Sequence, residues 1–146
     1  MLSPGLLTHL VREAIDAART GDLHDVDEAI YRISQLGDVM DLLAMCRVCA
    51  DTAVRALLAL YGPADPSRGE MWVLDDLGDA QGPERLFAAR VVTAHANRDS
   101  DTVCALVMAA DRAGGSERCG SLRELLLYAA GLDARAAQMK RAARNE

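Results

Sequence analysis

The fold of this protein is decided by the stretch VMDLLAMCRVCADTAVRALLALY, residues Val39 to Tyr61. Its apolar side chains fall almost all round a helical projection, which is typical of a helix buried in a protein core. Asp38 can accept hydrogen bonds from the first turn, and Gly62 can end the helix, so both ends carry a signal. We therefore predict one long helix here, with the other helices packed around it.

Four charged residues interrupt this stretch, namely Asp41, Arg47, Asp51 and Arg55. A charge at the centre of a bilayer costs about 2.5–3.5 kcal/mol, so we do not expect the stretch to span a membrane. Arg47, Asp51 and Arg55 follow one another at four-residue spacing and are expected to face solvent as a ladder of ion pairs. Leu57 lies on the opposite side of the helix and is expected to be fully buried.

Upstream of this helix the sequence predicts two shorter helices. Ser3 and Pro4 are typical of a helix start, and Gly21 is typical of a helix end. The residues from Asp25 to Glu28 form a capping box that would begin the second helix, which Gly37 would end. Each segment carries an apolar stripe at helical spacing, which indicates one buried face.

Downstream, a loop from Gly62 to Ser67 contains two prolines and divides the chain into two halves, 1–62 and 67–146. Capping residues and glycines predict further helices in the second half. These are a short helix after the capping box Ser67–Glu70, one from Pro83 to about Asn97, one from Asp99 or Asp101 to Ala113, one from the capping box Ser121–Glu124 to about Gly131, and a last one after Asp133.

The composition is that of a globular, helical protein. Hydrophobic residues make up 51% of the chain and charged residues 26%. Ala, Leu and Arg, which are strong helix formers, are frequent, and no stretch shows the alternation of a half-buried strand. We therefore predict a single all-α domain over residues 1–146, built as a compact bundle of seven to eight helices or as a short stack of antiparallel helical hairpins.

The two halves resemble each other when the chain is shifted by 77 residues. Asp22 then falls on Asp99, Val26 on Val103, Ile30 on Val107 and Gly37 on Gly114. The turn Gly21–Leu23, with Val26, Ile30 and Ile33 after it, resembles the turn and second helix of a tetratricopeptide repeat. This resemblance implies stacked helical hairpins that bind peptides or protein partners. An ordinary bundle is the alternative, because any antiparallel helix pair needs a capped turn and an apolar stripe.

The charge of the chain argues against two classes of partner. The formal net charge is −6 and aromatic residues make up 3%, which disfavours binding to nucleic acid or to anionic membranes. The end of the last predicted helix is basic, but cations there also complement the helix dipole. Its basic residues are Arg135, Lys140, Arg141 and Arg144. The first five residues lack the pattern of a secretory signal, so we expect a cytoplasmic protein.

Cys46 and Cys49 form a C-x-x-C motif and are the candidate metal or redox residues. Their spacing places both sulfur atoms on one helix face, where they could share a metal ion. Structural zinc usually takes four ligands, however, and Cys104 and Cys119 do not form a second pair. The motif also lies mid-helix, away from the helix N-terminus that lowers a thiol pKa. We expect reduced thiols that pack in the core.

A second polar cluster contains His24, Asp25, Asp27 and Glu28, which could ligate a divalent cation. Acidic residues also stabilise the first turn of a helix, and that is the reading we favour. Asp75, Asp76 and Asp79 lack the spacing of a calcium loop and are expected to form a solvated turn. No phosphate-binding loop and no hydrolase motif is present in the sequence, so we predict no catalytic residue and no cofactor.

Together these observations favour a non-catalytic protein-interaction or regulatory module, which binds a protein partner or associates with itself as a homodimer. Two alternatives stay open. The first is a small regulator that responds to metal or redox state through Cys46 and Cys49. The second is a small enzyme or ligand-binding bundle with its site in a pocket between helices.

Overall fold

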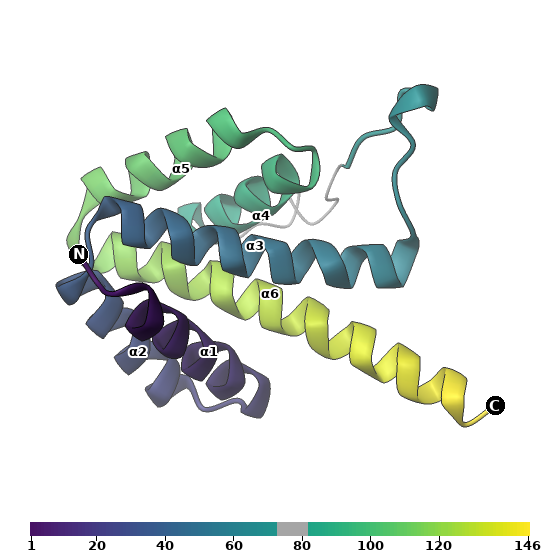
Figure 1. Cartoon of the computed structure of the whole chain (residues 1–146), viewed down its shortest axis with the longest axis horizontal. Coiled ribbons are helices and arrows are strands. Elements are labelled where there is room, and N and C mark those ends of the chain that lie inside the picture. The colour runs from purple at the N-terminus through teal and green to yellow at the C-terminus, as the bar shows by residue number, and fades with distance from the viewer. Residues whose placement is uncertain (73–81) are drawn as a thin grey trace.

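The computed structural model describes residues 1–72 and 82–146, which contain helices and no strand (Figure 1). The predicted all-α class is confirmed, but the described residues form six α-helices and one short 3-10 helix instead of seven to eight helices. The elements are α1 (Pro4–Thr20), α2 (Leu23–Leu36), α3 (Val39–Tyr61), η1 (Pro66–Arg68), α4 (Pro83–Ala96), α5 (Ser100–Ala113) and α6 (Gly115–Arg144). The acidic turn predicted at Asp75, Asp76 and Asp79 lies outside the described residues.

Helices α3 and α6 form the centre of the bundle. They run side by side in the same direction, and each contacts every other α-helix (Figure 1). The hairpins α1–α2 and α4–α5 lie on opposite sides of this pair, and in the described part of the chain neither hairpin contacts the other. The architecture is therefore a compact bundle around two parallel helices, and the hairpins do not stack directly. Membership of the tetratricopeptide family stays a prediction.

One hydrophobic core joins the two halves, with buried side chains from all six α-helices. Leu57 is 3% exposed, which confirms its predicted burial. Arg47, Asp51 and Arg55 are exposed on the other face of α3, as predicted, and Arg55 contacts Asp51 at 3.0 Å. The long helix α3 therefore keeps one face exposed, and it shares the centre of the bundle with α6, whereas the sequence predicted α3 as the single central helix. No helix among the described residues is long and apolar enough to cross a membrane.

The shift of 77 residues that relates the two halves also relates their helices. Residues 23–36 of α2 fall on residues 100–113, which are the bounds of α5. The turns before these helices contain corresponding hydrogen bonds. The Asp22 amide donates to the Ala17 carbonyl at 2.9 Å, and the Asp99 amide donates to the Ala94 carbonyl at 2.8 Å. The two hairpins therefore have the same turn.

Two predicted helix starts are wrong. The cap of α2 is Asp22, whose side chain accepts a hydrogen bond from the Asp25 amide, so the proposed box at Asp25 to Glu28 already lies within the helix. The box Ser67–Glu70 does not begin an α-helix. Instead η1 covers Pro66–Arg68, and Met71 and Trp72 after it are not helical.

The predicted break near Gly131 is also wrong, because α6 runs without interruption through Ser121, Gly131 and Asp133. A glycine inside a helix costs about 1 kcal/mol relative to alanine, which is little beside the burial of a helix that contacts all the others. Asp133 does not cap a helix. Its Oδ2 instead forms an ion pair with Arg19 of α1 at 2.6 Å.

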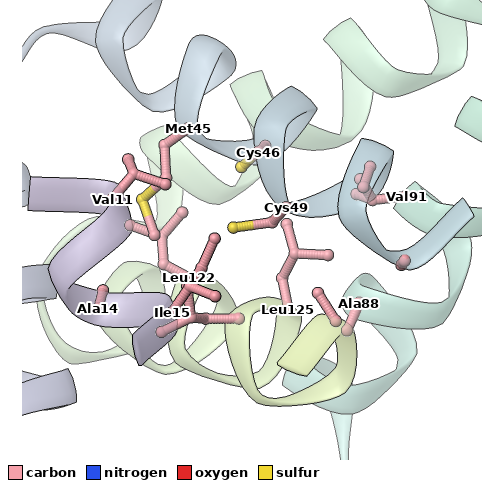
Figure 2. Packing of buried hydrophobic residues seen from close by; sticks show 14 of the residues in the cluster. Val11, Ala14, Ile15, Met45, Cys46, Cys49, Ala88, Val91, Leu122 and Leu125 are labelled. Atoms are coloured by element: carbon pink, nitrogen blue, oxygen red, sulfur yellow. The ribbon is translucent and has the colours of Figure 1, made fainter. Parts of the chain in front are cut away.

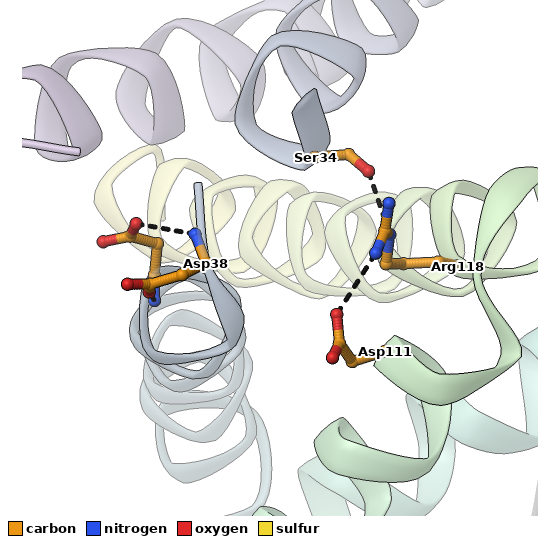
Figure 3. A network of polar contacts seen from close by, with 5 residues as sticks. Ser34, Asp38, Asp111 and Arg118 are labelled. Atoms are coloured by element: carbon orange, nitrogen blue, oxygen red, sulfur yellow. Dashed lines mark hydrogen bonds and ion pairs between the residues drawn. The ribbon is translucent and has the colours of Figure 1, made fainter. Parts of the chain in front are cut away.

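Two polar contacts fix how the helices meet. Arg118 of α6 donates from Nε to the buried Ser34 hydroxyl of α2 at 3.0 Å and from its guanidinium to Asp111 of α5 at 3.2 Å (Figure 3). Asp41 is buried in the first turn of α3, where its Oδ2 accepts hydrogen bonds from the amides of Asp38 and Leu2, both at 2.9 Å. These two hydrogen bonds lower the pKa of Asp41 below its usual value.

Candidate binding groove beside Trp72

A groove of about 900 Å³, which we call the Trp72 groove, lies between α3 and the turn from α4 into α5. The exposed face of α3 forms one wall, and the turn from α4 into α5 forms the other. The segment between η1 and Trp72 also lines it. Its lining residues are Arg47, Asp51, Val54, Leu58, Pro63, Ala64, Gly69, Glu70, Met71, Trp72, His95, Ala96, Asn97, Arg98, Ser100 and Val103.

Trp72 is held in the groove by one side chain. The Trp72 amide donates to Asn97 Oδ1 at 2.8 Å, and Asn97 Nδ2 donates to the Trp72 carbonyl at 3.0 Å. Asn97 therefore binds both backbone groups of Trp72, as a neighbouring β-strand would, and ties the segment before Trp72 to the end of α4. The half-buried Trp72 side chain lines the groove beside this contact.

The groove exposes apolar side chains that no described element covers. Leu58 of α3 is 42% exposed and Met71 is 66% exposed, while Val54 and Trp72 are half-buried. Trp and Met are enriched where proteins bind one another, and Trp is a frequent centre of binding energy. This surface can therefore accept an apolar side chain of a ligand.

The charged side chains of the groove are unequally satisfied. Asp51 contacts both Arg55, at 3.0 Å, and His95, at 3.6 Å. Glu70 accepts a hydrogen bond from the Asp65 amide at 2.8 Å. Arg47 and Arg98 have no carboxylate partner within residues 1–72 and 82–146, although Arg47 lies 3.4 Å from the Ser100 hydroxyl.

Cys46 and Cys49 lie on the opposite face of α3, inside the hydrophobic core. Both are fully buried among apolar side chains such as Met45, Leu122 and Leu125 (Figure 2). Burial raises the pKa of the Cys49 thiol to about 12 and that of Cys46 also, so the thiolate that binds metal or attacks a disulfide is disfavoured. Both are free thiols, and their surroundings are those of packing residues.

The cluster near the start of α2 is only partly assembled. One ligand atom each from His24, Asp25 and Glu28 lies within 4.8 Å of the others, and all three residues are exposed. Asp27, the fourth predicted member, instead contacts Arg123 of α6 at 2.8 Å. The side-chain hydrogen bond and the charge of Asp22 raise the pKa of Asp25. The cluster is therefore a group of crowded carboxylates at a helix N-terminus.

Sequence reasoning missed the Trp72 groove because its residues come from three separate segments and form no motif. One local signal was available, since Asn97-Arg98-Asp99 occupies the positions that correspond to Thr20-Gly21-Asp22 after the shift of 77. An arginine thus stands where the other half has a glycine. Comparison with protein-family models, with curated proteins and with solved structures finds no match to this chain.

Proposed function

We propose that this protein is a non-catalytic interaction module that binds a segment of a partner protein in the Trp72 groove. The observation that carries the proposal is the exposed apolar surface of Leu58 and Met71 beside the half-buried Trp72, whose backbone groups bind Asn97. Such a surface needs no reactive side chain.

The size and lining of the groove support a polypeptide segment. A volume of about 900 Å³ is at the upper end for small-molecule pockets, which span about 300–1,000 Å³ and enclose most of their ligand. The groove instead lies along the surface between α3 and the α4–α5 turn. The metal- or redox-responsive alternative is less favoured, because Cys46 and Cys49 are buried on the other side of α3.

A pair of matched variants tests the proposal. Leu58 and Val48 are both on α3 and are 42% and 47% exposed, but Val48 does not line the groove. The native protein and the variants Leu58→Asp and Val48→Asp would be purified with their bound proteins from the source cells. Each enriched protein would then be purified and titrated into the native chain, with emission from Trp72, the single tryptophan, as the readout.

We expect a purified partner to shift the Trp72 emission of the native protein and of Val48→Asp, and to bind Leu58→Asp at least tenfold more weakly, since a buried charge disrupts an apolar contact. Equal loss of binding in the two variants would place the interface elsewhere. A bound protein that leaves the Trp72 emission unchanged would contradict the proposal as well.

A further inference from the structure

We infer that the segment bound in the Trp72 groove is acidic, and that Arg98 and Arg47 are its specificity-determining residues. This inference rests on the proposed function, and it adds the charge of the partner. The expected ligand is a polypeptide segment with one or more apolar side chains for the Leu58 and Trp72 surface and with carboxylates beside them for the two arginines.

The first argument is the backbone of Arg98. Its φ is 60°, and it is the single non-glycine residue with positive φ among those described. Gly21 takes the same place in the α1–α2 turn, with φ 77°. A left-handed conformation strains any residue that has a Cβ atom, and arginine lacks the short side chain that lets Asn or Asp tolerate it. The fold would therefore be served better by glycine, which points to a role for the arginine side chain.

The second argument is electrostatic. Of the two carboxylates that line the groove, Asp51 contacts Arg55 and His95, whereas Glu70 accepts a hydrogen bond from the Asp65 amide. The guanidinium groups of Arg47 and Arg98 have no such carboxylate in the described part of the chain. A ligand that enters the groove therefore meets two guanidinium groups that no carboxylate of residues 1–72 and 82–146 pairs with, and carboxylates complement such groups through paired hydrogen bonds.

The third argument selects a polypeptide over nucleic acid as the anionic partner. The formal net charge of −6 repels a polyanion at long range, whereas a short acidic segment carries few charges. The groove offers Leu58 and Met71 beside the arginines, and these suit aliphatic or aromatic side chains. Trp72 is half-buried against the protein, which leaves no row of exposed rings on which bases could stack.

The test uses defined probes and the full chain. Three capped peptides share one pattern of leucines and carry glutamate, glutamine or lysine at the remaining positions. A single-stranded thymidine oligonucleotide is the fourth probe. Each is titrated into the native protein, Arg98→Gly, Arg47→Gln, Leu58→Asp and the control Arg12→Gln, and Trp72 emission is followed at low and high salt. Arg12 is an exposed arginine of α1 and does not line the groove.

We expect the glutamate peptide to bind the native protein about tenfold more tightly than the glutamine peptide, since one charge-assisted contact has about that effect. Arg98→Gly and Arg47→Gln should each lose most of this preference, and Arg12→Gln should keep it. Arg98→Gly should also melt at a higher temperature than the native protein, which shows that its loss of binding is not a loss of fold.

Several results would overturn the inference. Equal binding of the glutamate and glutamine peptides, unchanged in the arginine variants, would refute the acidic preference while the proposed groove stands. Binding of the glutamate peptide to Leu58→Asp as tightly as to the native protein would show that it binds outside the groove. Preference for the oligonucleotide would show that the groove binds a nucleic acid and not a protein segment. No binding of any probe would refute the acidic recognition, and the partner titration with Val48→Asp and Leu58→Asp would still decide the proposed function.

Discussion

The α1–α2 turn and the α4–α5 turn share one backbone path but place different residues at its left-handed position. Gly21 occupies that position in the first turn and Arg98 in the second, and the next residue, Asp22 or Asp99, caps the following helix in both. Glycine meets the demand of the turn without strain, and arginine does not. The comparison separates what the fold requires from what the surface beside the second turn requires.

The same comparison extends to other corresponding positions of the two halves. Asp41 of α3 corresponds to Arg118 of α6 after the shift of 77, and each holds a helix start in place by polar contacts. Asp41 binds backbone amides of its own half, whereas Arg118 joins Ser34 of one half to Asp111 of the other. The second half therefore carries a side chain that binds to both halves, as well as the turn that faces the groove.

The largest difference between the halves concerns the ends of their long helices. Leu57 of α3 is 3% exposed, and its counterpart after the shift, Ala134 of α6, is exposed. Leu57→Ala should cost about 2–5 kcal/mol, through lost transfer free energy and a cavity. Asp51→Ala on the opposite face should cost about 0.2–0.5 kcal/mol, as an exposed helix pair does. Denaturant melts of both variants measure these values. A larger loss of stability for Asp51→Ala would show that the assignment of the buried and exposed faces of α3 is reversed.

The cysteines give the second test. Both thiols of the first half are fully buried in α3, whereas Cys104 and Cys119 of the second half are partly exposed. Changing Cys46 and Cys49 together to alanine should cost about 1–3 kcal/mol and leave partner binding and oligomeric state unchanged. In native protein near neutral pH, a thiol reagent should modify two cysteines first, because burial raises the pKa of Cys49 to about 12.

Stoichiometric bound zinc in the purified protein would contradict this packing role, as would a change of assembly on mild oxidation. Either result would favour the metal- or redox-responsive regulator. Full modification of all four thiols at one rate would instead show that the core around Cys46 opens readily.

The third test breaks the contact between the halves. Arg118→Met keeps much of the aliphatic stem but leaves the buried Ser34 hydroxyl and the Asp111 carboxylate without their donor. We expect a loss of about 1–3 kcal/mol, the usual cost of an unsatisfied buried polar group. The double variant Arg118→Met with Ser34→Ala should recover part of the loss, since it removes the unsatisfied hydroxyl. No recovery in thermal melts would show that Ser34 contributes nothing to the contact.

The sequence predicted helix ends where a cap and a glycine agree, as at Ser3, Gly21, Asp38 and Gly62. It failed in α6, because Gly131 and Asp133 carry the local signal of a helix break that tertiary packing outweighs. Asp133 looks like a cap until its partner, Arg19 of α1, is known. The groove could not be predicted, since Asn97 and Trp72 meet only when the segment after η1 returns to the end of α4, and no local pattern encodes that contact.

The fourth test concerns Asp41. Its hydrogen bonds to the Asp38 and Leu2 amides lower its pKa in the folded state, so its contribution is complete above the unfolded-state pKa and is lost as pH falls through the folded-state value. Asp41→Ala should cost about 1–2 kcal/mol at neutral pH, the range for a lost helix cap. The gap between the melts of the variant and the native protein should narrow in acid. A gap that stays constant between neutral and acidic pH would assign the loss to packing.

The smallest expected effect decides the comparison of the two turns directly. A Cβ atom added at Gly21 meets no atom within 4 Å, so Gly21→Ala adds backbone strain to the folded state without a steric clash. It should cost about 1 kcal/mol, the usual penalty of a left-handed residue with a Cβ atom. Arg98→Gly should give a gain somewhat below about 1 kcal/mol, because relief of strain is offset in part by the greater freedom of glycine in the unfolded chain. Thermal melts of both variants at equal concentration measure the two shifts.

Stability changes of opposite sign in the two variants would show that Arg98 lowers stability where it stands, as a residue kept for binding would. A loss of stability in Arg98→Gly would mean that the arginine side chain supports the fold. The first argument for an acidic ligand would then fail.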